Sequence, residues 1–291
     1  MTLIESIERQ SARLTQAGVS FGHGTDNAFD EAVWLALWRL GLPLDELDAV
    51  ADRVLTAEDA AAIEALVDER IASRRPAAYL TGEAWLQGIP FCIDERTIVP
   101  RSLIAELIAD PDQAQGLDAW LGADPRQVLD LCTGNGSLAV LAAMAWPDVT
   151  VDAADLSADA LAVAMLNLER HSLADRITLH PGDGLAAVAG RRYDLILCNP
   201  PYVNSASMAA LPAEYLREPA LALAGGDDGM DFIRPLMVQA AAHLTDGGLL
   251  VLEIGHEAAH FQAAFPQLEF AWLPTHRGDD QVVVVTRENL T

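Results

Sequence analysis

The chain reads Val128-Leu129-Asp130-Leu131-Cys132-Thr133-Gly134-Asn135-Gly136-Ser137 near its middle, and a run of small and apolar residues, 138–145, follows directly. The first four residues are typical of a buried strand, and the run after them has the length and composition of a helix. The two glycines allow a tight turn between them and let a ligand approach the backbone. The stretch therefore predicts a strand–turn–helix unit with a binding site at the carboxyl end of the strand.

Further strand candidates follow this unit and alternate with helical patterns, as a parallel sheet with crossover helices requires. The last two apolar runs have no helix of crossover length between them, so we expect them to pair antiparallel at one edge. The prediction is an α/β fold with a doubly wound, mostly parallel seven-stranded sheet. The expected strands are residues 128–131, 150–154, 177–179, 193–197, 249–252, 270–272 and 281–285.

The first part of the chain has a different pattern. Residues 29–38 and 57–71 show helical periodicity, and either Asp26 or Asn27 is placed to cap the first of these helices. Two short apolar runs after them predict a hairpin connector, with strands at 84–86 and 91–93. We therefore expect a small helical domain over residues 1–78, the connector over 79–100 and the larger domain over 101–291.

Composition limits the classes of protein that fit. A formal net charge of −25 repels a nucleic-acid backbone and suits a basic protein partner. No apolar run is long enough to span a bilayer, and the N-terminus lacks the pattern of a secretory signal, so we expect a cytoplasmic protein without membrane contact. The three cysteines lie singly in apolar segments, which indicates reduced core thiols.

Acidic residues follow the second and third expected strands, on the same rim as the glycine turn. Asp155 lies roughly 20 residues beyond the glycines, where a carboxylate can accept both ribose hydroxyls. Ser157 is available to cap the next helix, which leaves Asp155 for the ligand. Asp183 could reach an adenine amino group, although a plain turn aspartate explains it almost equally well. The candidate cofactor-binding residues are Asp130, Thr133, Gly134, Asn135, Gly136, Ser137, Asp155, Asp183 and Asn199.

The glycine turn alone fits both a nicotinamide dinucleotide and S-adenosylmethionine. The fourth expected strand ends in Asn199-Pro200-Pro201-Tyr202, which we call the catalytic corner. The prolines hold it extended and have no N–H, so it presents carbonyl oxygens and the Asn199 amide oxygen to an incoming NH₂ group. Tyr202 can stack on a flat acceptor group. All four residues are candidate catalytic residues, and they favour methyl transfer from S-adenosylmethionine to an amide or nucleobase nitrogen.

No residue of this corner looks like a strong general base. An amide nitrogen is a poor nucleophile, but the methyl group of S-adenosylmethionine is already activated. The site must then chiefly hold nitrogen, methyl carbon and sulfur in line, and such orientation is worth roughly 7–11 kcal/mol. Acceptors on the two N–H groups also stabilise the positive charge that develops on the nitrogen.

The catalytic corner, the glycine turn and the segment Val99-Pro100-Arg101-Ser102 together resemble the bacterial protein-glutamine methyltransferases. The resemblance covers essentially the whole chain. It implies a Rossmann-like class I methyltransferase fold with S-adenosylmethionine as cofactor. It also implies that Asn199 and Pro200 bind the glutamine amide, while Gly134, Gly136 and Asp155 bind the cofactor.

The loop Gly22-His23-Gly24-Thr25-Asp26-Asn27, with Asp30-Glu31-Ala32 after it, looks like the branch of that family acting on large-subunit ribosomal protein three, L3. The other branch acts on peptide-chain release factors. A basic ribosomal protein as partner agrees with the acidic charge of the chain. The N-terminal domain lies outside the cofactor core, so we expect it to recognise the substrate.

Other functions fit parts of the sequence. DNA adenine methyltransferases share the catalytic corner, because an adenine amino group needs the same acceptors, but the chain lacks their basic face. The run 256–260 matches the zinc-hydrolase helix motif His-Glu-x-x-His, yet no third ligand is evident and we expect no metal. A binding module without catalysis is disfavoured because the acceptor corner is complete. The sequence assigns no role to His23, Arg101, Glu214 and Glu253.

Overall fold

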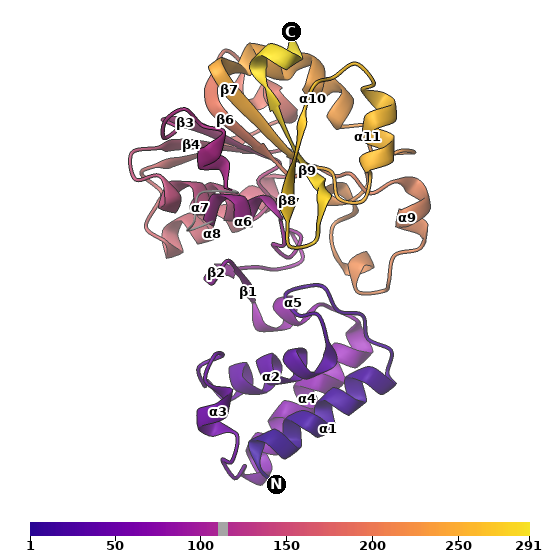
Figure 1. The fold of residues 1–291 in the computed structure, drawn as a ribbon. Coiled ribbons are helices and arrows are strands. Elements are labelled where there is room, and N and C mark those ends of the chain that lie inside the picture. Colours follow the sequence, from indigo (N-terminus) through magenta and orange to yellow (C-terminus); the bar gives the residue numbers. More distant parts are fainter. Residues whose placement is uncertain (110–115) are drawn as a thin grey trace.

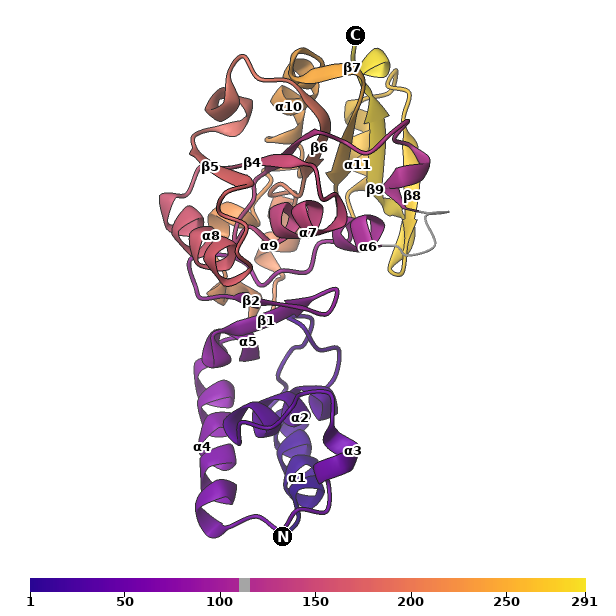
Figure 2. The ribbon, with the colours of Figure 1, turned by 90° about the vertical axis from the view of Figure 1, so that its left-hand side faces the viewer.

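A computed structural model describes residues 1–109 and 116–291 (Figure 1). The chain forms a small helical unit and a larger α/β unit, stacked end to end with a two-stranded hairpin between them (Figure 2). The N-terminus lies at the free end of the helical unit, and the C-terminus lies at the opposite end of the molecule.

One sheet contains all seven expected strands, in the order β5-β4-β3-β6-β7-β9-β8. The first five in this order are parallel, whereas β9 pairs antiparallel with both β7 and β8. The predicted doubly wound fold is therefore confirmed. The order reverses between β3 and β6, which is where such sheets bind ligands. The strands are β3 (Gln127–Leu131), β4 (Thr150–Asp155), β5 (Ile177–Pro181), β6 (Tyr193–Cys198), β7 (Leu244–Glu253), β8 (Ala271–Thr275) and β9 (Gly278–Thr286).

Helices cover both faces of the sheet, as buried parallel strands require. The first apolar cluster lies under α6, α7 and α8, and the second lies under α10 and α11 (Figure 1). The middle of β6 is fully buried between them, which explains its continuous apolar sequence. The helices are α6 (Ile104–Ala109), α7 (Ser137–Ala145), α8 (Ala158–Arg170), α9 (Ser205–Ala209), α10 (Ile233–Gln239) and α11 (Ala258–Ala264). Short 3-10 helices are η1 (Leu117–Ala119), η2 (Gly184–Val188), η3 (Tyr215–Arg217), η4 (Ala220–Ala222), η5 (Ala240–His243) and η6 (Arg287–Leu290).

The helical unit packs around its own apolar cluster. Asn27 caps α2, because its side chain accepts a hydrogen bond from the Asp30 N–H at 3.0 Å. Asp26, the other candidate for this cap, instead lies 3.4 Å from Arg277 of the larger unit. The helices are α1 (Leu3–Gln16), α2 (Ala28–Arg39), α3 (Leu47–Val50), α4 (Ala57–Ser73) and α5 (Ala77–Thr81).

The hairpin consists of β1 (Glu83–Leu86) and β2 (Ile89–Cys92). Only Gln87 and Gly88 form its turn, at φ values of 50° and 73°. The expected start of the second strand at residue 91 is therefore wrong, because this left-handed pair closes the hairpin in two residues and β2 begins at Ile89. Asn167 of α8 anchors β2 by bonding to the N–H and the carbonyl of Cys92 at 2.6 and 3.0 Å.

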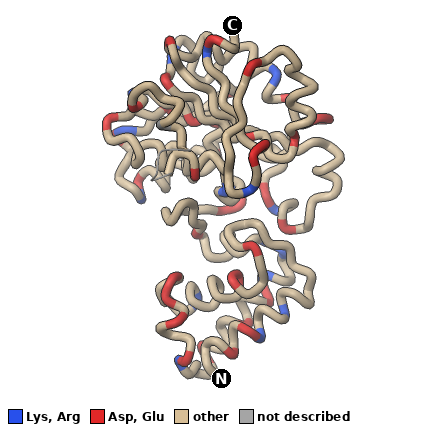
Figure 3. Tube along the Cα trace, in the orientation of Figure 1, with Lys and Arg blue, Asp and Glu red and all other residues tan. Residues whose placement is uncertain are grey.

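Acidic positions are distributed over both units (Figure 3). At the junction of the units, Glu214 forms ion pairs with Arg70 and Arg74 of the helical unit, at 3.5 and 3.2 Å. Arg70 is fully buried and also bonds to Glu31 at 2.9 Å. Across residues 1–109 and 116–291, no helix has the length and apolar character needed to cross a membrane.

Candidate active site

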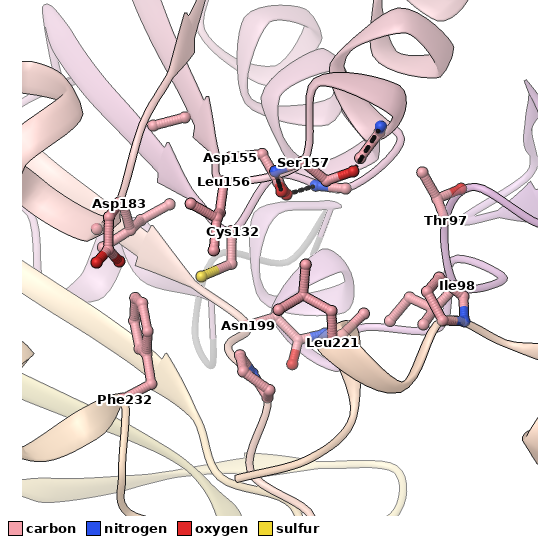
Figure 4. Close-up of a pocket in the computed structure, with 18 of the residues that line it drawn as sticks. Thr97, Ile98, Cys132, Asp155, Leu156, Ser157, Asp183, Asn199, Leu221 and Phe232 are labelled. Atoms are coloured by element: carbon pink, nitrogen blue, oxygen red, sulfur yellow. Dashed lines mark hydrogen bonds between the residues drawn. The ribbon is translucent and has the colours of Figure 1, made fainter.

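A first cavity opens at the carboxyl ends of β3, β4, β5 and β6 (Figure 4). Asp155 and Leu156 form one part of its wall, while Asp183 and Phe232 form another and Asn199 a third. Gly134 also lines it. The sheet thus brings four of the expected cofactor-binding residues, Gly134, Asp155, Asp183 and Asn199, to one cavity.

Asp155 is more constrained than the sequence suggests. As expected, Ser157 caps α8 by accepting a hydrogen bond from the Ala160 N–H. However, Asp155 also binds the backbone, accepting the N–H of Gly134 at 2.9 Å and that of Ser157 at 2.8 Å. Burial raises the pKa of this carboxyl group. Because a carboxylate has about four lone-pair sites, Asp155 can fix the glycine turn and still accept a ligand hydroxyl.

Asp130 lies under the glycine turn and does not line the cavity. Its Oδ2 atom accepts the Thr133 hydroxyl at 2.5 Å and the Ala139 N–H at 2.9 Å, so it joins the turn to the start of α7. Its Oδ1 atom is buried without a hydrogen bond in the described structure. Burial raises the pKa of this carboxyl group to about 7.

The other candidate residues of the turn, Thr133, Asn135, Gly136 and Ser137, also lie outside the set that lines the cavity. The Asn135 carbonyl accepts a hydrogen bond from the Asn167 side chain at 2.9 Å, which ties the turn to α8. Gly136, at φ 80°, packs so closely on α8 that an added Cβ atom would come within 3.2 Å of Ala164. Ser137 is the first residue of α7 and is buried. These residues shape the turn, whereas Gly134 and Asp155 border the cavity.

The first cavity has apolar surfaces that sequence reasoning missed. Leu156 is 56% exposed although it is apolar, and it lines the cavity together with Phe232 and Leu221. These three apolar side chains beside two carboxylates suit a nucleoside, whose base needs apolar contact and whose hydroxyl and amino groups need acceptors. The position of Leu156, directly after the expected acid, was the available sequence signal.

The catalytic corner follows β6 and lies at the border between the first cavity and a second one. Asn199 lines both cavities, Pro201 lines the first, and Pro200 and Tyr202 line the second. The second cavity has a volume of about 560 Å³. Residues 20–22 of the helical unit form part of its wall. A group in the second cavity can therefore meet a group in the first at Asn199.

Glycines hold the catalytic corner in place. A Cβ atom added at Gly229 would come within 2.2 Å of the Tyr202 carbonyl oxygen, and one added at Gly255 would come within 2.4 Å of the Tyr202 ring. The Tyr202 hydroxyl donates to Glu253 Oε1 at 3.3 Å. The ring thus has a fixed position at the wall of the second cavity.

The structure shows the contacts of Glu253 and Arg101, which the sequence did not reveal. Glu253 is buried at the second cavity and accepts the Ser102 hydroxyl at 2.6 Å and the Leu103 N–H at 2.9 Å. Burial raises the pKa of its carboxyl group, against the effect of these bonds. Arg101 donates two hydrogen bonds to the Glu218 carboxylate, at 2.6 and 2.7 Å. No sequence signal pointed to Glu218, which is 117 positions away from Arg101.

The zinc motif is not formed as the sequence suggested. Helix α11 begins at Ala258, so His256 lies outside it and cannot share a helical face with His260. The reason is that Gly255, at φ 53°, turns the chain before the helix starts. Glu257 instead accepts a hydrogen bond from the Asn204 side chain at 2.6 Å and pairs with His260. Among the described residues, no group of three or more His, Cys, Asp or Glu is arranged to hold a metal ion.

Comparisons with known proteins agree with this architecture. Two family models match the chain, the PrmC N-terminal domain over residues 5–82 and the methyltransferase small domain over residues 115–227. A ribosomal protein uL3 glutamine methyltransferase of Bordetella pertussis is 53% identical over 99% of this chain and 96% of its own. A protein of the same name from Burkholderia pseudomallei is 49% identical over 99% of this chain and 95% of its own.

The chain belongs to the ribosomal protein uL3 glutamine methyltransferase family. Membership confirms the resemblance and removes the nicotinamide and zinc interpretations. Among solved structures, the hMettl16 catalytic domain in complex with the MAT2A 3'UTR hairpin 6 is similar, with a TM-score of 0.52 and 14% identity over 79% of this chain and 81% of that one. This likeness concerns the fold alone, and it agrees with the class I methyltransferase fold.

Proposed function

We propose that this member of the uL3 glutamine methyltransferase family transfers a methyl group from S-adenosylmethionine to the side-chain amide nitrogen of a glutamine in ribosomal protein uL3. The observation that carries the proposal is the place of Asn199 at the border of the two cavities. A cofactor in the first cavity and a glutamine in the second would meet there. The choice of uL3 as the substrate comes from the names of the relatives given above.

In the first cavity, Asp155 would accept the ribose hydroxyls and Asp183 the adenine amino group, between the apolar side chains of Leu156 and Phe232. Gly134 has no side chain, so the backbone can approach the cofactor, and its φ of 56° also favours glycine at this position. Asp130, Thr133, Asn135, Gly136 and Ser137 would act through the shape of the turn. The bound cofactor supplies a methyl group made electrophilic by its sulfonium.

In the second cavity, the glutamine amide would donate one N–H to Asn199 Oδ1 and the other to the Pro200 carbonyl. Pro201 keeps Pro200 extended, and Tyr202 excludes water from the amide, since its ring is fixed by Gly255 and Glu253. These acceptors orient the nitrogen and stabilise the charge that it gains as the new bond forms. One N–H proton then leaves the nitrogen for solvent.

The substrate protein would contact both units. We take residues 1–78 as the N-terminal domain, 79–100 as the connector and 101–291 as the methyltransferase domain, and we assign substrate recognition to the first. This assignment is supported by Ser20, Phe21 and Gly22 of the N-terminal domain, which form part of the wall of the second cavity. A basic, cytoplasmic ribosomal protein suits a chain with a net charge of −25, whereas DNA does not.

Deletion of residues 1–78 tests this assignment. We expect the shortened protein to lose methylation of uL3 while it keeps cofactor binding, which titration calorimetry with S-adenosylmethionine would measure. Cofactor binding also serves as the check that the core is folded. Methylation of uL3 at the full-length rate would contradict the role given to the N-terminal domain.

Replacement of Asn199 tests the chemistry. We expect Asn199→Ala to reduce kcat by about 10²–10³, because one of the two acceptors of the amide protons is lost. Labelled S-adenosylmethionine, ribosomal proteins from cells lacking the enzyme, and peptide mass mapping would locate the methyl group. Asn289→Ala is the matched control, since Asn289 lies on η6, away from both cavities. Label on release factors or on DNA in place of uL3 would refute the proposed substrate.

A further inference from the structure

One wall of the second cavity depends on both units of the molecule. Tyr215, on η3, lines this cavity beside the residues of the catalytic corner. Its ring contacts His23 of the N-terminal domain, with 4.2 Å between the ring centroids. The guanidinium carbon of Arg101 lies 5.5 Å from the centroid of the same ring. An imidazole and a cation thus both contact the Tyr215 ring.

Glu218 connects the two groups that hold this ring. Its carboxylate is completely buried and binds Arg101 with both oxygens, while Oε1 also accepts the Val99 N–H at 2.9 Å. The His23 Nε2 atom lies 3.5 Å from Glu218 Oε2. Although burial opposes ionisation, the charge of Arg101 lowers the pKa of Glu218 to about 2. Glu218 therefore holds Arg101 against Tyr215, and His23 lies beside the same carboxylate.

Gly22 determines how close the loop can come to Tyr215. A Cβ atom added at Gly22 would lie 2.5 Å from the Tyr215 hydroxyl oxygen, and the backbone there has φ 116°. Only glycine fits both the conformation and the space. Gly22 and His23, the first two residues of the loop that resembles the L3 branch, thus both lie against Tyr215.

The Tyr215 hydroxyl is available for a ligand. Among the described residues it has no hydrogen-bond partner, and because it is not one of the buried polar atoms without a partner, it remains accessible. Two neighbouring side chains of the cavity are already engaged, since the Tyr202 hydroxyl donates to Glu253 and Arg101 donates to Glu218. The catalytic corner offers acceptors, so a polypeptide bound there also needs donors for its carbonyl groups.

We propose that Tyr215 determines substrate specificity by contacting the polypeptide that carries the glutamine, and that Gly22 and His23 position it for this contact. The hydroxyl donates to a carbonyl oxygen of that polypeptide, and the ring packs against its neighbouring side chains. The inference rests on the proposed function, and it gives a physical basis for the substrate recognition that we propose for the N-terminal domain. Tyr215 is absent from the residues that line the first cavity, so cofactor binding does not depend on it.

The test combines three variants with steady-state kinetics on uL3 and direct measurement of the Kd values for uL3 and S-adenosylmethionine. We expect Tyr215→Phe to raise KM and Kd for uL3 about fivefold, the loss of one hydrogen bond. Tyr215→Ala, which also removes the ring, should raise both at least tenfold. The Kd for S-adenosylmethionine should stay within about twofold of wild type. Leu216→Ala, next in sequence and 61% exposed, should leave all three values unchanged.

A glycine pair tests the positioning. Gly22→Ala should raise KM for uL3 at least tenfold, because the new methyl group displaces Tyr215. Gly24→Ala is its control: Gly24 has a similar φ of 104° in the same loop, but its Cβ would meet Trp34 at 3.4 Å. Equal effects of the two substitutions would overturn the positioning role.

The outcomes separate this inference from the proposed function. If wild type methylates uL3 and the Tyr215 variants bind uL3 as wild type does, the specificity role is refuted and the function stands. If wild type neither binds nor methylates uL3, both proposals fail. In the Tyr215 variants, a fall in kcat or in cofactor affinity at unchanged Kd for uL3 would show that Tyr215 acts only on the methyltransferase domain. This result would also refute its role in substrate specificity.

Discussion

Asp130 is a carboxyl group in an apolar interior, held by only two hydrogen bonds to one of its oxygens. Burial raises its pKa from 3.8 to about 7. A carboxyl group whose pKa is higher in the folded state contributes full stability below the unfolded pKa, near 4. That stability is lost as the pH rises through the folded pKa, near 7. At neutral pH, this shift in the pKa of Asp130 lowers the free energy of unfolding by an amount on the order of 4 kcal/mol.

Asp130→Asn should remove this dependence, because asparagine keeps an acceptor for the Thr133 hydroxyl and the Ala139 N–H but does not ionise. We expect the free energy of unfolding of the variant, relative to wild type, to increase between pH 4 and pH 8. Urea denaturation of both proteins across that range would measure it. A constant difference between the two proteins would show that Asp130 titrates normally in the fold.

At the scale of elements, the loop between η4 and α10 supports the catalytic corner through glycine. Gly229→Ala would place a methyl group 2.2 Å from the Tyr202 carbonyl oxygen. Because this oxygen belongs to the backbone, it cannot move aside as a flexible side chain could. We expect kcat for uL3 to fall by about 10²-fold, as misplaced reacting groups imply, with cofactor affinity retained. Kinetics and calorimetry on the same samples would check both.

Gly247→Ala provides the comparison for this prediction. Gly247 has φ 77°, close to the 80° of Gly229, but no atom lies within 4 Å of its added Cβ. The strain of the left-handed backbone is then similar, on the order of 1 kcal/mol, and only the steric effect on Tyr202 differs. Similar kcat values for the two variants would disprove the supporting role of Gly229.

The elements could be predicted because their signals are local. The buried strand β6 is a continuous apolar run, and the prolines after it fix the catalytic corner without help from distant residues. The supports of the site could not be predicted in this way. Asn167 joins the hairpin to the glycine turn across 75 and 32 positions, and Glu218 meets Arg101 across 117. Such pairs become visible only when the fold brings them together.

The run 256–260 also shows the difference between a local sequence signal and the contacts that the fold makes. The residue types of the run 256–260 match a helix motif, but the local signal is incomplete because Gly255 and the contacts of Glu257 delay the helix until Ala258. The Glu257 side chain is used to hold Asn204, three residues beyond Pro201. Its role in this fold is therefore to support the loop after the catalytic corner.

At the scale of the whole molecule, charge should affect encounter with the substrate more than it affects chemistry. A chain with a net charge of −25 attracts a basic protein over distances comparable to the Debye length, about 10 Å at 0.1 M salt. In the proposed function, by contrast, the cofactor is held by short-range contacts with the residues that line the first cavity. The two affinities should therefore respond differently to ionic strength.

We expect KM for uL3 to rise about tenfold between 50 and 300 mM salt, mainly through slower association. Over the same range, KM for S-adenosylmethionine should change less than about twofold. Initial rates at several salt concentrations, with each substrate varied in turn, would measure both, and a short neutral glutamine peptide is the control because it lacks the charge that the surface attracts. Salt-independent KM values for uL3 would mean that the acidity is unrelated to its binding, and recognition would then rest on short-range contacts such as those at the second cavity.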